Sequence, residues 1–288
     1  MKKKLFNILI IIALAVTLAA CVTEQGGNEE VLSLGPIDGY VIIGGESFST
    51  EATLIDLTSM RLQDRDIVPL QYMTNLRALH MGRNSISDLS PISELTSLVN
   101  LNVEQNQISD LSPISGLTNL TWLTLNSNEV GDLSPISELT NLEWLSISNH
   151  TFSDILPFGI NYISDISPLS GLTNLSVLHL QGNQISDISP LSELTNLSHL
   201  WLSNNQISDL SPISGLTNLN SVELSNNKIS DVSPLLEFEN LWYISLSDNQ
   251  ISDISPLSEF TIGTISLFNN PITDWSPVEH IPHVGGRE

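Results

Sequence analysis

The side chains best suited to chemistry in this 288-residue chain are two histidines and one glutamate, His179, His199 and Glu223. Imidazole and carboxylate groups are common ligands of zinc, so these three residues could form a metal site if the fold brought them together. Around them the sequence contains no G-x-S-x-G, H-E-x-x-H, P-loop or C-x-x-C pattern. Whether they can act together depends on the elements that carry them.

A 22-residue unit recurs along most of the chain and sets the positions of these residues. LTNLTWLTLNSNEVGDLSPISE begins at Leu117, and LTNLSVLHLQGNQISDISPLSE begins at Leu172. Repeats of this length indicate a solenoid. The Leu-x-Leu element alternates as a β-strand does, so its leucines point inward, and stacking of neighbouring units buries them.

An asparagine recurs where each predicted strand ends and the chain turns. Its amide can donate to and accept from backbone groups of neighbouring coils, so we expect a structural role. The nine asparagines are Asn84, Asn106, Asn128, Asn161, Asn183, Asn205, Asn227, Asn249 and Asn270.

An aspartate follows each of these asparagines by four residues, from Asp88 to Asp274. Its carboxylate can accept hydrogen bonds from backbone N–H groups two or three residues ahead, where Ser-Pro favours a short helical turn. Stacking would place the aspartates about 5 Å apart, so hydrogen bonds or cations must offset their repulsion. Calcium is the alternative, although the glycine-rich nonapeptides of calcium-binding solenoids are absent.

The full pattern, LxxLxLxxNxIxDLxPL, covers residues 54 to 278 and resembles the short repeats of the internalin family and related bacterial leucine-rich-repeat surface proteins. The resemblance implies an α/β solenoid, a right-handed horseshoe or arc with a parallel sheet on its concave side. Short 3-10 or irregular turns would form the convex side. Two alternating stretches around Gly44-Gly45 predict a β-hairpin as the N-terminal cap, whereas the internalins proper have a helical cap.

The N-terminal residues have the features of a secretory signal: Lys2 to Lys4, an apolar run from Leu5 to Leu18, and small residues before Cys21. Leu18-Ala19-Ala20-Cys21 resembles the lipobox of bacterial lipoproteins, which implies lipidation of Cys21 and an extracytoplasmic, lipid-anchored protein. An uncleaved anchor helix is the alternative, but a membrane-spanning helix needs about 20 apolar residues.

These features predict a linear organisation. The expected parts are a signal peptide (1–20), a lipidated cysteine with a polar tether (21–34), a cap with a degenerate first repeat (35–73), leucine-rich repeats (74–278) with an insertion near 155–165, and a C-terminal tail or cap (279–288). The insertion carries Phe158, Ile160 and Tyr162, and His150 stands before it where an asparagine is due. It is either a tolerated loop or a protruding lip of a binding surface.

The formal net charge of −23 limits the partners. An acidic surface repels nucleic-acid phosphates and anionic headgroups, so we expect no nucleic acid and membrane contact through the lipid alone. The sequence contains no cofactor motif, and we expect a monomer.

Strands in register place residues 22 apart in columns across the sheet. Against a background of Ser, Thr and Asn, aromatic residues in two columns predict a contact surface for a protein or peptide, because binding hot spots are enriched in Trp and Tyr. The predicted residues are Trp122, Trp144, His179, His199, Trp201 and Tyr243. Aromatic pairs that merely stabilise the sheet are one alternative, and a glycan ligand stacked on tryptophan is another.

The same columns argue against a metal enzyme. His179 and Glu223 would lie two coils apart, about 9 to 10 Å, with Trp201 between them, whereas zinc ligands lie about 2 Å from the metal. The sequence therefore predicts a binding protein and no enzyme.

Overall fold

The computed structural model describes residues 35–149, 160–238 and 240–287. The predicted signal peptide, the tether, Cys21, His150 and Phe158 lie outside the described residues. Residues 34–288 belong to one compact unit.

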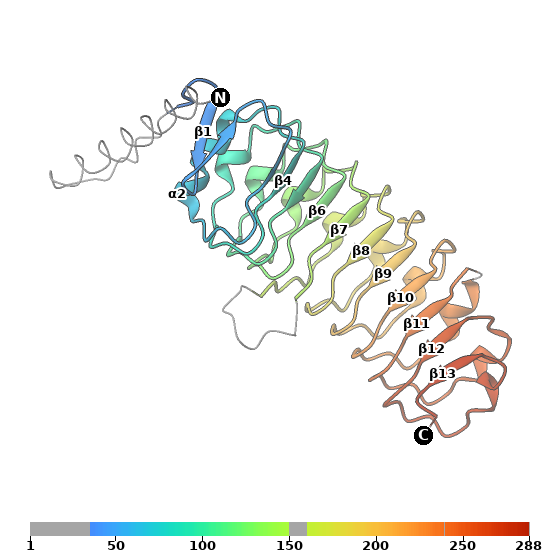
Figure 1. The fold of residues 1–288 in the computed structure, drawn as a ribbon. Helices are drawn as coiled ribbons and strands as arrows, with labels where there is room; N and C mark the ends of the chain where they lie inside the picture. The colour runs from blue at the N-terminus through green and yellow to red at the C-terminus, as the bar shows by residue number, and fades with distance from the viewer. Residues whose placement is uncertain (1–34, 150–159, 239, 288) are drawn as a thin grey trace. The chain divides into compact units, whose positions relative to one another are not determined.

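One parallel sheet of eleven short strands runs through this unit, in sequence order (Figure 1). The strands are β3 (Leu54–Asp56), β4 (Ala78–His80), β5 (Asn100–Asn102), β6 (Trp122–Thr124), β7 (Trp144–Ser146), β8 (Val177–His179), β9 (His199–Trp201), β10 (Ser221–Glu223), β11 (Tyr243–Ser245), β12 (Thr264–Ser266) and β13 (His283–Gly285). The predicted register is confirmed: Trp122 pairs with Trp144, and His179 pairs with Trp201.

Short turns connect the strands on the other side of each coil. They are α2 (Asp64–Ile67) and the 3-10 turns η1 (Val68–Tyr72), η2 (Ser90–Ile92), η3 (Ser112–Ile114), η4 (Ser134–Ile136), η5 (Ser167–Leu169), η6 (Ser189–Leu191), η7 (Ser211–Ile213), η8 (Ser233–Glu237), η9 (Ser255–Glu259) and η10 (Ser276–Val278). Each 3-10 turn has one proline, at its first or second position, where the missing N–H removes no hydrogen bond. The short turns predicted by the Ser-Pro element are thus confirmed.

The space between the sheet and the turns is filled by one continuous apolar core. In the unit that begins at Leu117, the side chains of Leu117, Leu120, Leu123 and Leu125 are fully buried. Because each coil supplies only a layer of this core, its apolar side chains are covered by the coils before and after it. The other face of the sheet, which we call the open face, is therefore free to carry residues that folding does not require.

The N-terminal cap contains the predicted hairpin. Strands β1 (Tyr40–Ile43) and β2 (Glu46–Ser49) pair antiparallel. Gly44 and Gly45 connect them with φ angles of 57° and 85°, as a two-residue turn of this kind requires. In the degenerate unit that follows, Leu62 replaces the ladder asparagine and is buried, and its N–H donates to Asn84 Oδ1 of the next coil.

The C-terminal end holds more structure than a tail. Strand β13 pairs with β12, and Ile281 is buried against the last coil, so the segment extends the sheet by one strand. The sequence predicts a tail or cap there and no strand, because the segment lacks the Leu-x-Leu pattern. Within the described residues, no helix is both long and apolar enough to cross a membrane.

Candidate binding site

Four of the predicted binding residues form one continuous stack of rings on the open face, which we call the aromatic row: Trp122, Trp144, His179 and Trp201. The rings of Trp122 and Trp144 are parallel, with centroids 4.0 Å apart. Those of His179 and Trp201 are also parallel, 3.9 Å apart. An edge contact of 5.0 Å between Trp144 and His179 joins the two pairs.

The row crosses from one column of the sheet to the next. Trp122 and Trp144 hold the first position of β6 and β7, whereas His179 and Trp201 hold the third position of β8 and β9. The residue directly opposite Trp144 is Val177, so the edge contact with His179 is a diagonal one. Aromatic side chains are long enough to reach across such diagonals.

Exposure is highest at Trp122 and lowest at His179. Trp122 is 37% exposed, Trp144 and Trp201 are half-buried, and His179 is only 8% exposed. The Trp122 indole donates to Thr124 Oγ1 over 3.1 Å. The Trp201 indole nitrogen is buried without a hydrogen-bond partner among the described residues.

His179 is held neutral in this setting. Burial, with a smaller effect from nearby His199, lowers the pKa of His179 from 6.5 to about 4. At neutral pH its imidazole therefore stacks on Trp201 as an uncharged ring, and the row is an apolar stripe on an otherwise acidic protein.

The other two predicted residues flank the row. His199 lies opposite Val177 and Ser221, and its Nδ1 lies 2.9 Å from Ser198 Oγ. Tyr243, two strands further on, contacts the ring of Trp242 at 5.7 Å. The structure thus brings four of the six residues into one contact chain and leaves two beside it.

Glu223 lies on the open face beside Tyr243, and its environment is partly apolar. Burial raises the pKa of Glu223, although hydrogen bonds from the Tyr243 and Ser203 hydroxyls act in the opposite direction. Among the described residues, no group of three or more His, Cys, Asp or Glu side chains is arranged to hold a metal ion.

The asparagine ladder has the structural geometry that the repeat predicts. Asn106 is fully buried. Its Oδ1 accepts from the N–H of Ile86, and its Nδ2 donates to the carbonyl oxygens of Met81 and Val103, at 2.9 to 3.0 Å. Equivalent bonds are made by Asn84, Asn128, Asn161, Asn183, Asn205, Asn227, Asn249 and Asn270.

Asn161 occupies the ladder position that the 22-residue spacing assigns to His150. The regular repeat therefore resumes at Asn161, and Tyr162, which the sequence places in the insertion, belongs to the repeat. Asn149 connects the two sides of the insertion: its Nδ2 donates to the Asn161 carbonyl over 2.7 Å, and its Oδ1 accepts from the Asn161 N–H over 2.8 Å. Beyond this junction, Tyr162 is half-exposed and lies over Gly131. These contacts fix the end of the insertion to the repeats.

The aspartate column is stabilised by hydrogen bonds. Asp165 accepts from the Ser167 N–H over 2.8 Å, as the Asp-x-Ser-Pro element predicts. Bonds to the backbone and side chain of Ser167 lower the pKa of Asp165, against repulsion from Asp132 and Asp187. Calcium is therefore not required to offset the repulsion in this column.

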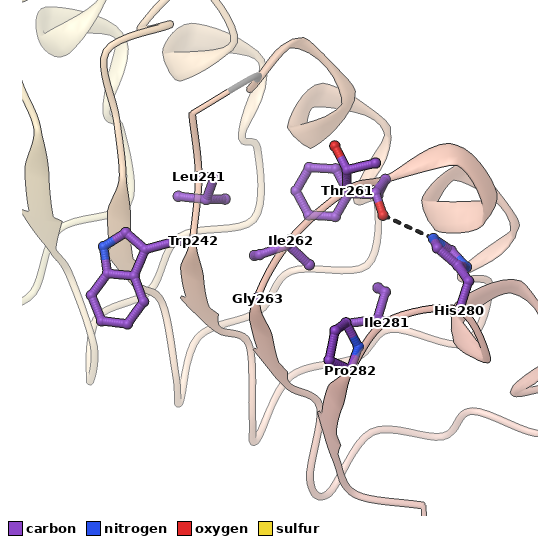
Figure 2. A pocket seen from close by; sticks show the side chains of 9 residues that line it. Leu241, Trp242, Thr261, Ile262, Gly263, His280, Ile281 and Pro282 are labelled. Atoms are coloured by element: carbon purple, nitrogen blue, oxygen red, sulfur yellow. Dashed lines mark hydrogen bonds between the residues drawn. The ribbon is translucent and has the colours of Figure 1, made fainter.

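A pocket of about 350 Å³, which was not predicted from the sequence, lies near the C-terminal end of the sheet (Figure 2). Trp242, which is 57% exposed, forms one wall. The available signal was the break in the repeat between Phe260 and Thr264, where the unit is one residue shorter than the preceding one. The lining residues are Leu241, Trp242, Phe260, Thr261, Ile262, Gly263, His280, Ile281 and Pro282.

Comparison with known proteins agrees with this architecture. The family model described as leucine-rich repeats (two copies) matches residues 74–116, 158–193 and 195–237. The comparison with curated proteins gives no significant match.

Several solved structures have the same fold. An internalin (InlF) of Listeria monocytogenes is 30% identical, with a TM-score of 0.68 over 84% of this chain and 76% of that chain. Internalin C2 (InlC2) of the same organism is 36% identical, with a TM-score of 0.61 over 71% and 83% of the two chains.

A more distant match is the Arabidopsis receptor kinase HAESA, solved with the peptide hormone IDA and the co-receptor SERK1. It is 22% identical, with a TM-score of 0.64 over 76% of this chain and 38% of that chain, which shows the fold alone. From its repeats, its sheet and these similarities, the chain belongs to the internalin-like leucine-rich-repeat proteins.

Proposed function

We propose that this chain is a lipid-anchored bacterial surface protein that binds a protein or peptide partner through the aromatic row on its open face. The observation that carries the proposal is the continuous contact of Trp122, Trp144, His179 and Trp201 across four neighbouring strands. The leucine core lies on the other side of the sheet, so the fold does not require these rings. The leucine-rich-repeat scaffold favours binding over catalysis.

The size and chemistry of the row suit a protein surface. Four strands about 4.8 Å apart extend over about 14 Å, the span of a short peptide segment. Tryptophan is the residue type most enriched in binding hot spots. The receptor kinase HAESA, which has the same fold, was solved in complex with a peptide hormone, and this supports a peptide as the kind of partner.

The unpartnered Trp201 indole supports a role beyond stability. A buried N–H without an acceptor costs about 1–3 kcal/mol, and a phenylalanine would provide a similar ring without that donor. A row selected for sheet stability alone has no use for this nitrogen.

A glycan ligand is the second candidate, because tryptophan rings stack on sugars. The parallel pairs Trp122–Trp144 and His179–Trp201 each cover one face of both rings. Fewer ring faces are then left for a sugar, whereas ring edges are well suited to packing against protein side chains. The geometry therefore favours a protein partner.

The site assignment can be tested by crosslinking on intact cells followed by mass spectrometry of the captured partner. Trp144→Ser and Trp201→Ser should each reduce capture about tenfold or more, as loss of a hot-spot tryptophan does. Tyr40→Ser, which removes an exposed aromatic ring on the hairpin, should leave capture unchanged. Undiminished capture by both row variants, with circular dichroism showing an intact fold, would refute the site. Glycan-array binding without a protein partner would support the glycan instead.

The lipid anchor requires its own experiment. Cys21→Ser should move the protein from the membrane fraction to the soluble extracytoplasmic fraction, because Cys21 is the only cysteine available for acylation. In a separate test, globomycin should block processing of the unaltered chain at Cys21. Processing that is insensitive to globomycin would contradict lipidation, and it would leave the proposal for the aromatic row untouched.

A further inference from the structure

The pocket between the last coils is separate from the aromatic row and arises from an irregularity in the repeat. Relative to the preceding unit, one residue is missing between Phe260 and Thr264, so Gly263 occupies the place that Trp242 occupies one coil earlier. A Cβ at Gly263 would lie 3.0 Å from the Trp242 carbonyl oxygen. The glycine thus lets the shortened chain pass close to the Trp242 backbone, and both residues line the pocket.

The lining is mainly apolar and partly rigid. The exposed ring of Trp242, the buried Ile262 and Ile281, and the exposed Pro282 surround the space (Figure 2). His280 is fixed there by a 2.9 Å hydrogen bond between its Nε2 and the Phe260 carbonyl oxygen. A volume of about 350 Å³ is at the small end for ligand sites, which suits one apolar side chain better than a whole cofactor.

Two carboxylates adjoin this apolar space in the chain. Glu259 and Glu279 are exposed and directly precede the lining residues Phe260 and His280. Glu259 is the fifth residue of a turn that begins at Ser255, a place that alternates between glutamate and glycine in the six repeats from Glu94 to Gly215. Glu279 is the fourth residue counted from Ser276, and His280 takes the fifth place in that last turn.

We propose that this pocket is a second binding site, which receives an apolar side chain that a partner protein presents between basic residues. The apolar side chain fills the space beside Trp242, and lysine or arginine on either side meets the carboxylates of Glu259 and Glu279. The exposed face of Trp242 also accommodates a cation, since indole attracts lysine and arginine.

Titration with a short peptide, followed by NMR, tests the proposal on the folded chain. The probe is acetyl-Lys-Leu-Lys-amide, and the readout is the set of indole N–H signals from the five tryptophans, assigned by substitution. The Trp242 signal should shift saturably, and the Trp122, Trp144 and Trp201 signals should not. Acetyl-Glu-Leu-Glu-amide should bind at least about fivefold more weakly, because its charges face like charges.

Substitutions separate the apolar and the electrostatic contributions. Thr261→Phe places a bulky group at an exposed lining position and should abolish the shift. Glu259→Gln and Glu279→Gln should each weaken binding about two- to threefold, the effect of an exposed ion pair. Glu193→Gln is the matched control for Glu259, at the same place in a distant turn, and should leave the affinity unchanged.

Three results would overturn the proposal. The first is the absence of a saturable Trp242 shift with the basic peptide while the fold stays intact. The second is equal affinity for the basic and acidic peptides, and the third is a Trp242 shift that persists in Thr261→Phe. None of these results bears on the aromatic row, whose tryptophans are observed separately in the same spectra.

Discussion

One amide group of Asn106 connects two coils of the solenoid, because it bonds to Ile86 and Met81 of the preceding coil and to Val103 of its own. The whole arrangement is buried, so water cannot replace these bonds when the side chain is lost. The ladder could be predicted from the sequence because a repeat of fixed length places the same side chain at the same turn in every coil.

Asn106→Ala should therefore lower the free energy of unfolding by about 1–3 kcal/mol, since it leaves the buried Ile86 N–H without a partner. It also removes one of the two ladder donors to each of the Met81 and Val103 carbonyl oxygens, which keep their bonds to Asn84 and Asn128. Urea denaturation followed by circular dichroism measures the effect. Asn119→Ala, which removes one exposed hydrogen bond to Thr96, should cost less than about 1 kcal/mol. Equal losses in the two variants would show that the ladder has no special role.

The buried His179 makes the stability depend on pH. The unfolded chain binds a proton at this imidazole near pH 6.5, whereas the folded chain does so only near pH 4. Between these values the unfolded state binds more protons, so the stability falls as the pH is lowered from 6.5 towards 4. His179→Phe keeps an aromatic ring but cannot titrate, and it should lose less stability over this range.

Urea midpoints at pH 7.0 and 5.0, compared between the two proteins, isolate this effect. The aspartates with lowered pKa values affect the stability only below about their usual pKa of 3.8, outside the range from pH 7.0 to 5.0. The raised pKa of Glu223 makes the stability increase as the pH falls, which is opposite to the effect of His179. Because Glu223 is present in both proteins, its effect cancels in the comparison. The same pH dependence with and without His179 would contradict its burial as a neutral ring.

Ring contacts were the part of the site that the sequence could not predict. The spacing of 22 places Trp122 beside Trp144 in one column and His179 beside Trp201 in the next. The diagonal contact that joins the two pairs depends on side-chain rotamers, which the repeat does not determine. The same limit applies to His199 and Tyr243, which share a column with the row without a ring contact to it in the described residues.

At the scale of elements, the segment after the insertion is adapted to the repeat before it. Gly131 stands where most other units have serine, and a Cβ there would overlap the ring of Tyr162. The Tyr162 N–H donates to the Val130 carbonyl oxygen over 2.9 Å, so the backbone holds the ring over this glycine. Gly131 and Tyr162 are therefore a coupled pair.

Gly131→Ser should displace the Tyr162 ring and destabilise the protein by about 1–3 kcal/mol, the usual cost of overpacking. Tyr162→Ser, which removes the ring, should make the same glycine substitution nearly neutral. A double-mutant cycle of unfolding free energies measures the coupling, and additive effects would show that the two residues are independent. Ser109→Ala, in the preceding unit, is the control for a change at this place in the turn.

The elements themselves differ in how far the sequence specified them. Gly44-Gly45 allows the positive φ angles of a tight hairpin turn, and Ser-Pro specifies the start of each 3-10 turn. Strand β13 has no such local signal, because the two inward places of its Leu-x-Leu element carry Val284 and Gly286. It forms because β12 leaves an edge of unpaired backbone groups that a following segment can cover.

At the scale of the whole chain, stability comes from contacts between neighbouring coils, so each end needs a cover. At the C-terminal end, β13 pairs with β12 and Ile281 lies over the last layer of the core. Deletion of residues 279–288 should expose both the edge of β12 and that layer. In a solenoid this damage should stay near the end, because each coil contacts mainly its neighbours.

Hydrogen exchange followed by mass spectrometry tests this expectation with spatial resolution. The amides of β11 and β12 should exchange at least about tenfold faster in the truncated chain, since loss of a partner strand allows local opening. Amides of β4 to β6, at the other end of the sheet, should keep their protection and serve as the internal control. Ile281→Ala should give a weaker effect in the same strands, because it reduces the apolar cover and keeps the strand pairing. Unchanged protection in β12 after truncation would mean that the last coil is stable without β13, and faster exchange throughout the sheet would mean that the coils unfold as a single unit.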